Sequence, residues 1–126
     1  DLNRLKGYLP LTGSSVLNKR EVLRPESVRE FDMLKINIID SMAHACHDSD
    51  IRFVTVQSPR NSIAEQQAFT KLLVSVLHKQ KGEYWNYVND TLFMDNPNLF
   101  KDGAHLNDDG AQVFTQRIIQ KLKNNF

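Results

Sequence analysis

The fold is decided by the stretch Ile51-Arg52-Phe53-Val54-Thr55-Val56-Gln57-Ser58, which is followed by Pro59. This stretch is rich in β-branched and apolar residues, which favour strands, and a proline cannot continue the hydrogen-bond ladder of a sheet. The pattern therefore predicts a strand that stops at Pro59 and is buried on both faces, as the strands of parallel sheets are.

Helical patterns lie on both sides of this strand. From Pro25 to about His47 the apolar residues recur at spacings of three and four, and Pro25 suits a first helical turn. After the strand, Ser62 and Glu65 form a capping box for a second helix, and Gly82 lies where its C-terminal cap belongs. The predicted apolar stripes are Val28, Phe31, Leu34, Ile38, Met42 and Cys46 in the first helix, and Phe69, Leu72, Leu73, Val76 and Leu77 in the second.

A second strand and a last helix follow. Residues 84–88 form a short aromatic segment of strand character, and Pro97 with its polar neighbours indicates an irregular loop. Asn107 can cap the last helix, in which the charges agree with the helix dipole. This helix carries Asp108 and Asp109 in its first turn, Lys121 and Lys123 at its end, and the stripe Ala111, Phe114, Ile118 and Leu122.

The order helix, strand, helix, strand, loop, helix is the repeating unit of an α/β protein with a parallel sheet. Two strands make a poor sheet, and Leu5 to Leu11, interrupted by Gly7 and Pro10, is a weak candidate for a third. We expect residues 25–126 to form the α/β core of a single domain, and residues 1–24 to be loop or linker, with Thr12 to Lys19 the most flexible part.

Composition excludes several classes of protein. The 126 residues are 40% hydrophobic and 25% charged with a net charge of +1, and the basic residues form no sustained cluster, so no nucleic-acid partner is expected. Cys46 is the only cysteine, which excludes an intrachain disulfide framework. The apolar runs are far shorter than the roughly 20 residues of a membrane span. The chain starts at Asp1 without a methionine, so a signal peptide or anchor could precede it.

The loop before the last helix carries Asp102-Gly103-Ala104-His105, an Asp-x-x-His element. A histidine acts as a general base at neutral pH when a carboxylate fixes its tautomer by accepting a hydrogen bond from the N–H of the other ring nitrogen. On a tight turn, side chains three residues apart can point to the same side, and Gly103 gives the backbone the freedom to make that turn. The loop also follows the last strand, where ligands of open parallel sheets bind. Asp102 and His105 are therefore candidate catalytic residues.

The surrounding block, Leu99-Phe100-Lys101-Asp102-Gly103-Ala104-His105-Leu106-Asn107-Asp108-Asp109-Gly110-Ala111, resembles the final conserved block of the SGNH, or GDSL-like, hydrolase superfamily. In that family an aspartate, two residues and the catalytic histidine precede a Leu-Asn or similar pair and a Gly-Ala that opens the terminal helix. The strand Phe53 to Ser58 and the Tyr-rich strand before the block also look like the family's later strands. The resemblance covers most of residues 25–126 and implies part of a three-layer α/β/α parallel-sheet fold of flavodoxin-like type.

The resemblance implies a serine ester hydrolase or O-acyltransferase, in which His105 takes the proton from a serine hydroxyl and Asp102 orients the imidazole. The family places its nucleophile in a Gly-Asp-Ser block, and its oxyanion donors are a glycine and an asparagine in two middle blocks. None of these three blocks is present, and Gly13-Ser14-Ser15 lacks the aspartate of the first. We therefore expect the C-terminal part of a larger enzyme, inactive by itself, whose N-terminal half supplies the nucleophile.

The expected partners follow from the same resemblance. The substrate is an acyl ester, and a sugar-stacking platform made by Tyr84, Trp85 and Tyr87 would suit a carbohydrate-linked one, although core packing is the commoner use of such residues. No cofactor is implied. The edge of an incomplete sheet is expected to pair with the missing N-terminal half or with another copy in a homo-oligomer. Relatives in this family often act in the bacterial periplasm, at the cell surface or as secreted proteins.

Several residues have a second interpretation, and two other functions are possible for the chain. His44 and His47, with Cys46, Asp48 and Asp50 nearby, resemble a metal site, but a helix C-terminus and an apolar stripe explain them better, so no metal site is expected. Ser58 either lines a pocket or begins a Ser-Pro turn. Two other functions share the same pattern. One is a non-catalytic SGNH-like module that binds a partner protein or polysaccharide, and the other is a flavodoxin-like ligand or receiver domain, for which no phosphate loop or acidic cluster is found.

Overall fold

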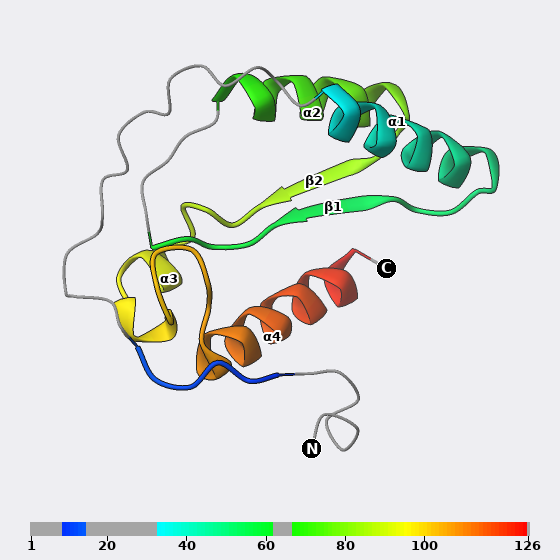
Figure 1. Ribbon diagram of the computed structural model, residues 1–126. Coiled ribbons are helices and arrows are strands. Elements are labelled where there is room, and N and C mark those ends of the chain that lie inside the picture. The colour runs from blue at the N-terminus through cyan, green and yellow to red at the C-terminus, as the bar shows by residue number, and fades with distance from the viewer. Residues whose placement is uncertain (1–8, 15–32, 62–66, 126) are drawn as a thin grey trace. The chain divides into compact units, whose positions relative to one another are not determined.

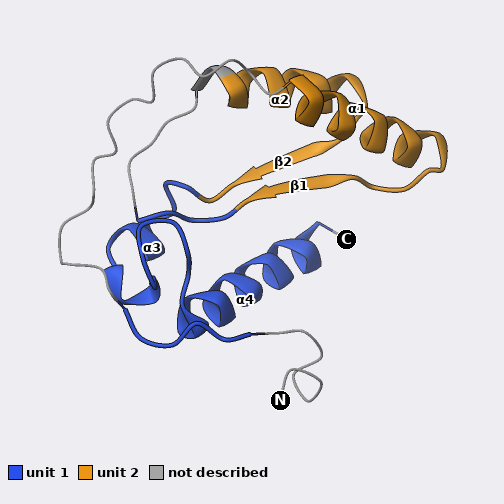
Figure 2. Ribbon diagram, in the orientation of Figure 1, with its two compact units in different colours: residues 1–22, 58–63, 88–126 blue, residues 23–57, 64–87 orange. Residues whose placement is uncertain are grey.

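The computed structural model describes residues 9–14, 33–61 and 67–125 of the chain. The chain divides into two compact units (Figure 2), of which unit 1 comprises Asp1–Val22, Ser58–Ile63 and Val88–Phe126, and unit 2 comprises Leu23–Gln57 and Ala64–Tyr87. Several predictions lie outside the described residues, namely Pro25, Val28 and Phe31 in the first helix, the Ser62 and Glu65 capping box, and residues 5–8 of the candidate third strand. The remaining residues of that candidate third strand, Leu9 to Leu11, form no strand.

Unit 2 contains a two-stranded parallel sheet. Strand β1 (Val54–Gln57) pairs with β2 (Glu83–Asn86) in a register that sets Val54 opposite Glu83 and Gln57 opposite Asn86. Parallel strands need a crossover connection, which here contains helix α2 (Gln67–Lys79). The predicted mixed α/β class with a parallel sheet is thus confirmed for the described residues.

Two helices cover one face of this sheet (Figure 1). Helix α1 (Met33–Asp48) packs against α2, and α2 packs against β2. The predicted stripe of α2 is confirmed, because it supplies the largest part of the core. That core consists of buried Ile36, Ala43, Leu73 and Leu77, with Ile39, Phe53, Phe69, Leu72, Val76 and Tyr84 packed against it.

The predicted apolar stripe of α1 is wrong at three of its four described positions, while the fourth, Cys46, is half-buried. Leu34, Ile38 and Met42 are 68%, 50% and 52% exposed, whereas Ile36 and Ala43 are buried. The helix carries apolar residues on two faces, and both sets recur at spacings of three and four, so periodicity alone could not select the face that meets α2. The result is an exposed stripe of Leu34, Ile38 and Met42, which we call the outer α1 stripe.

The first strand is shorter and less buried than predicted. Ile51 belongs to the end of α1, because its backbone N–H donates to the Cys46 carbonyl at 2.8 Å, and Asp50 beside it has a φ of 55°. With the bond from the Asp50 N–H to the His47 carbonyl at 3.1 Å, this contact forms a Schellman cap at the end of α1, so β1 begins only at Val54. Val56 within the strand is 40% exposed, which corrects the prediction of burial on both faces.

Helix α2 ends in the same way. The N–H of Lys81 donates to His78 and that of Gly82 to Leu77, so the left-handed residue is Lys81, with a φ of 56°. Gly82, predicted as that cap, lies one position further on, where a Cβ would come within 3.2 Å of Leu77 Cδ2. Strand β2 then starts at Glu83, one residue before the predicted segment.

The described part of unit 1 contains the short α3 (Thr91–Met94), a 3₁₀ turn (Pro97–Leu99) and the long α4 (Asp108–Asn124). The segment predicted as irregular loop therefore contains a helix, which Asp90 caps by accepting a hydrogen bond from the Leu92 N–H at 3.0 Å. Fully buried Phe93 meets Phe100 and Phe114 edge-on, at centroid distances of 6.5 and 5.9 Å. No helix in the described part of the chain is long and apolar enough to cross a membrane.

Candidate catalytic site

The Asp-x-x-His element forms a closed turn in unit 1. Phe100 and Leu106 pair in an isolated antiparallel bridge, and the Lys101 N–H donates to the His105 carbonyl at 2.8 Å. Phe100 is fully buried, so the base of the turn is anchored in the aromatic core. The loop therefore presents residues 102–105 from a fixed base.

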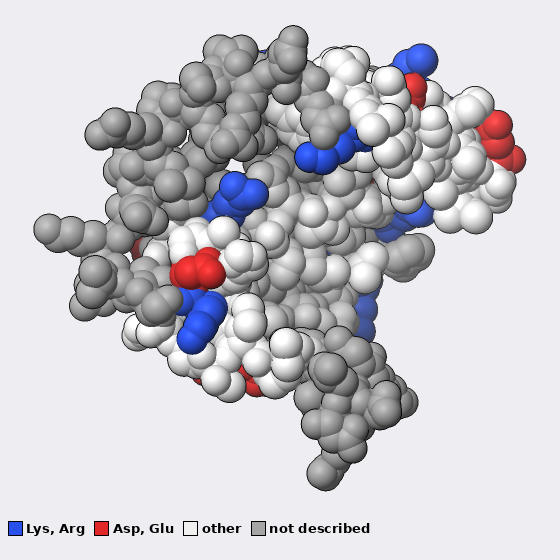
Figure 3. All heavy atoms as spheres, viewed as in Figure 1, with Lys and Arg blue, Asp and Glu red and all other residues white. Residues whose placement is uncertain are grey.

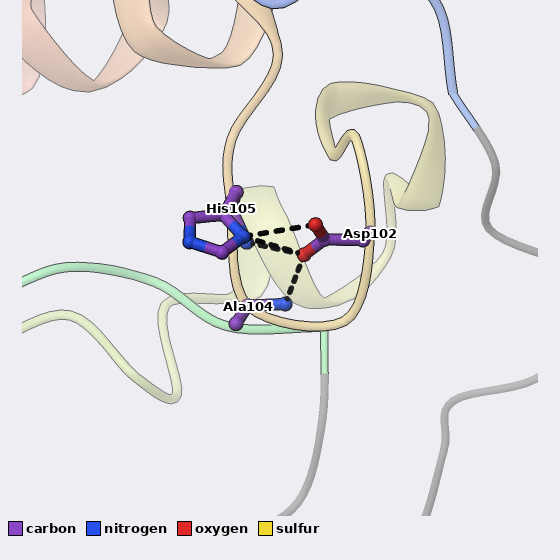
Figure 4. A network of polar contacts seen from close by, with 3 residues as sticks. All are labelled: Asp102, Ala104 and His105. Carbon is purple, nitrogen blue, oxygen red and sulfur yellow. Dashed lines mark hydrogen bonds and ion pairs between the residues drawn. The ribbon is translucent and has the colours of Figure 1, made fainter.

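Asp102 organises this turn (Figure 4). Its Oδ1 accepts hydrogen bonds from the backbone N–H groups of Ala104 at 2.8 Å and His105 at 2.9 Å. The same carboxylate lies 2.9 Å from His105 Nδ1 through both of its oxygens. The bond from Ala104 N–H, with that from the His105 side chain, lowers the pKa of Asp102 from its usual value, so the carboxylate is held ionised.

His105 is oriented by this contact. An ionised carboxylate only accepts hydrogen bonds, so the neutral imidazole that faces it must carry its proton on Nδ1. Its Nε2 then has a free lone pair, and Figure 4 shows Nε2 on the side of the ring away from Asp102. The His105 side chain is 66% exposed and that of Asp102 is 47% exposed. The two residues that the sequence singled out are therefore in contact, and their arrangement leaves a basic nitrogen directed outward.

The predicted cap of α4 is confirmed, and it also supports the turn. Asn107 Oδ1 accepts from the Gly110 N–H at 2.9 Å, while its Nδ2 donates to the Asn98 carbonyl at 2.6 Å. The Asn107 N–H donates to the Leu99 carbonyl at 3.0 Å. One buried side chain thus joins the start of α4 to the residues that precede the turn. The predicted stripe of α4, which consists of Ala111, Phe114, Ile118 and Leu122, is partly buried.

A segment near the N-terminus also contacts this turn. The carbonyl of Leu11 accepts from the Asp108 N–H at 2.9 Å, that of Thr12 from Lys101 Nζ at 2.9 Å, and that of Gly13 from Asn107 Nδ2 at 3.4 Å. The stretch predicted to be flexible therefore has two of its residues, Thr12 and Gly13, in contact with the turn, and its residues 15–19 lie outside the described part of the chain. Sequence reasoning missed the contact because main-chain carbonyls carry no residue-specific signal.

The segment after β1 also contacts the turn. The Asn61 N–H donates to the Gly103 carbonyl at 3.1 Å, in the middle of the Asp-x-x-His element. Pro59 is fully buried and Asn61 is 3% exposed, whereas Ser58 is exposed. Asn61 was not singled out in the sequence, and no motif surrounds it.

The other candidate residues do not form sites in the described structure. His44 Nε2 lies 3.5 Å from Asp48 on the surface of α1, and the described residues contain no group of three or more potential metal ligands. Trp85 is 4% exposed, donates to Glu83 and packs under Arg52, so its role is structural rather than that of a sugar platform. On the face in Figure 3, lysine and arginine atoms lie in several small separate groups, with acidic groups among them.

No protein-family model, curated protein or solved structure matches this chain. The interpretation of the site therefore rests on its own geometry, which provides an ionised carboxylate, an oriented imidazole and an outward-facing Nε2. Within the described residues no serine hydroxyl hydrogen-bonds to that nitrogen.

Proposed function

We propose that this chain is the C-terminal part of an SGNH-type serine ester hydrolase or O-acyltransferase, to which it contributes Asp102 and His105. The observation that carries the proposal is the contact of the Asp102 carboxylate with His105 Nδ1 at 2.9 Å, which leaves Nε2 directed away from it. This is the arrangement by which an aspartate prepares a histidine to act as a general base.

In the proposed reaction, His105 Nε2 removes the proton from a serine hydroxyl as the hydroxyl oxygen attacks the ester carbonyl. The imidazolium that forms is stabilised by ionised Asp102 and then protonates the leaving alkoxide, which releases the alcohol and leaves an acyl-serine. Water or a second alcohol attacks the acyl group, with His105 again taking and returning the proton. Hydrolysis and acyl transfer differ only in this acceptor.

The serine and the oxyanion donors come, in this proposal, from an N-terminal half that completes a three-layer α/β/α sheet. Two features of unit 2 support an additional layer of structure. Within the described residues β1 pairs with a strand on one edge only, and a two-stranded sheet is marginal by itself. The outer α1 stripe is also exposed, although a helix that is apolar on two faces is normally covered on both.

The same open edge is where a homo-oligomer would form if the chain is alone in solution. The 126-residue chain should then elute from size-exclusion chromatography as a multimer and show no esterase activity. A stable monomer would remove the proposed pairing of edges between copies. The proposed substrate is an acyl ester, with carbohydrate-linked esters as the first to test, and a bacterial envelope location follows from the family resemblance alone.

A second candidate function is a non-catalytic module of the same ancestry, which binds a partner protein or polysaccharide. It is favoured by one observation: the Asp102 carboxylate also accepts two main-chain hydrogen bonds, from Ala104 and His105. These bonds would hold the turn even if no chemistry occurred there.

The replacement Asp102→Asn separates the two candidates, in the complete polypeptide that includes the nucleophile. The asparagine oxygen can still accept the bonds from Ala104 and His105, so the turn should persist. The amide NH₂ that replaces Oδ2 can only donate a hydrogen bond to His105 Nδ1, and the side chain carries no negative charge. A catalytic pair predicts a loss of about 10⁴-fold in kcat on a short acyl ester, with the fold intact. His105→Ala should lose activity comparably, and His78→Ala, on the exposed side of α2, is the control. Activity that survives His105→Ala would remove the histidine from the mechanism.

A further inference from the structure

The turn that carries His105 is held from outside by residues 11–13, which we call the carbonyl strap. Three successive main-chain carbonyls of the strap accept hydrogen bonds, one from the limb that enters the turn and two from the limb that leaves it. The donors are Lys101 Nζ to Thr12 at 2.9 Å, the Asp108 N–H to Leu11 at 2.9 Å and Asn107 Nδ2 to Gly13 at 3.4 Å. The strap, in the blue segment of Figure 1, belongs to unit 1 as the turn does. It therefore joins the two limbs of the turn.

Lys101 is bonded both within the turn and to the strap. Its main-chain N–H donates to the His105 carbonyl at 2.8 Å, which closes the turn, while its ammonium group donates to the Thr12 carbonyl. Lys101 also directly precedes Asp102, whose carboxylate lies 2.9 Å from His105 Nδ1. A displacement of the Lys101 main chain is therefore transmitted to both members of the candidate catalytic pair.

The bond between Lys101 and the strap is suited to positioning more than to stability. Fixing a long lysine side chain costs conformational entropy, and Thr12 is exposed, so water can replace the ammonium group at its carbonyl. A general base is far more sensitive to its position, because a misplacement of about 1 Å can lower the rate about 10²-fold. Loss of this bond should therefore change the geometry of the pair while the fold remains.

We propose that Lys101 is a positioning residue of this site, which fixes the entering limb of the turn to the carbonyl strap and so holds Asp102 and His105 in register. This inference rests on the proposed function and adds to it a residue outside the Asp-x-x-His element. Because the acceptor is a main-chain carbonyl, what the proposal requires is a long side chain that donates a hydrogen bond at position 101.

Amide hydrogen exchange of the 126-residue chain, followed by nuclear magnetic resonance, measures the turn independently of activity. The N–H groups of Ala104 and His105 donate to the Asp102 carboxylate, so their exchange reports how firmly the pair is held. In Lys101→Met both should exchange about three- to tenfold faster, the range that corresponds to loss of one hydrogen bond. Lys101→Arg keeps a donor and should exchange as the parent does. Lys123→Met, exposed near the end of α4, is the matched control and should leave both rates unchanged.

Deletion of residues 1–14 separates the hydrogen bond from the charge of Lys101. The shortened chain keeps the ammonium group but loses its acceptor, so the same two amides should exchange at least as fast as in Lys101→Met. Adding Lys101→Met to the shortened chain should then change nothing further, because two changes that remove the same interaction are not additive. A full second effect, or unchanged exchange in Lys101→Met of the parent chain, overturns the inference. The methionine and arginine variants decide the matter if the shortened chain does not fold.

Steady-state kinetics of the complete polypeptide on a short acyl ester test the consequence for catalysis. Lys101→Met should lower kcat about tenfold and leave KM within about twofold, because the residue acts on the base and not on the substrate. Lys101→Arg should restore most of kcat. If kcat is unchanged in Lys101→Met while His105→Ala is inactive, the positioning role is overturned and the proposed function stands. If activity does not depend on His105, the proposed function itself fails and the catalytic role of Lys101 fails with it.

Discussion

Replacing Gly110 by alanine tests the packing that holds the catalytic turn against α4. Gly110 lies in the first turn of that helix and is buried. Its φ is not positive, so the helix does not need glycine for its backbone conformation. Helix propensity alone therefore predicts that alanine stabilises the protein by about 1 kcal/mol.

The structure predicts the opposite sign. A Cβ on Gly110 would overlap the carbonyl oxygen of Leu99 and lie 3.0 Å from the Leu99 carbonyl carbon and 3.1 Å from Leu106 Cδ2. The Leu99 atoms are main chain, so rotation of a side chain cannot relieve the overlap, and the same carbonyl accepts the Asn107 N–H. Overpacking costs about 1–3 kcal/mol, and loss of the Asn107 cap and of the Leu99 hydrogen bond costs about 1 kcal/mol each. After the propensity gain, the net destabilisation is about 2–4 kcal/mol.

Urea unfolding of the 126-residue chain, followed by far-ultraviolet circular dichroism, measures this change. With a slope of about 1–3 kcal/mol per molar urea, the midpoint of Gly110→Ala should fall by about 1 M or more. Gln116→Ala, on the exposed side of α4, is the control and should change stability by less than about 0.5 kcal/mol. If Gly110→Ala is as stable as the parent or more stable, the close packing of α4 against Leu99 is refuted.

Three further predictions concern single contacts. The pKa of Asp102 is lowered from 3.8 in the folded chain, so its ionised form stabilises the fold above that value, and this contribution is lost as the pH falls through the lower folded-state pKa. Asp102→Asn removes the titrating group and should therefore flatten this part of the acid-unfolding curve. An acid-unfolding curve identical to that of the parent would argue against the contact. The Asp90 side chain caps α3 and also forms an ion pair with Arg117 at 2.9 Å. Asp90→Ala should therefore lower the free energy of unfolding by about 1–2 kcal/mol, whereas Arg117→Ala should lower it by at most about 1 kcal/mol. Equal urea midpoints for the two variants would contradict this expectation. Trp85, the only tryptophan, is 4% exposed, so its fluorescence should resist quenching by iodide until unit 2 unfolds, and free quenching of the folded chain would disprove its burial.

The parts of the fold that the sequence predicted are those where one local signal dominates. Helix α4 carries a side-chain cap at Asn107, acidic residues in its first turn and a single apolar stripe, and all of these agree with the structure. Helix α1 carries two stripes, and only tertiary packing selects between them. The residues in the left-handed conformation that end α1 and α2 are Asp50 and Lys81 rather than glycine. Lysine has no intrinsic preference for this backbone conformation, so the sequence did not indicate Lys81 as the cap.

The candidate site also has a part that local sequence predicts and a part that only tertiary packing determines. Asp102 and His105 were predicted because their spacing places two side chains on one tight turn, a local property of the chain. The contacts that surround them come from Leu11, Thr12, Gly13 and Asn61, which are distant in sequence and act mainly through main-chain atoms. Main-chain hydrogen bonds leave no residue signature, so only the folded structure could place these segments beside the turn.

The central claim is that Asp102 holds His105 with its proton on Nδ1 and its Nε2 free to act as a base. Nitrogen-15 nuclear magnetic resonance of the 126-residue chain, at an alkaline pH where imidazoles are neutral, reports which ring nitrogen of each histidine is protonated. His105→Ala assigns the signal, and Asp102→Asn provides the comparison without the carboxylate. The account predicts the Nδ1–H tautomer for His105 in the parent chain and its loss in Asp102→Asn. A His105 ring protonated mainly on Nε2 in the parent chain would contradict it.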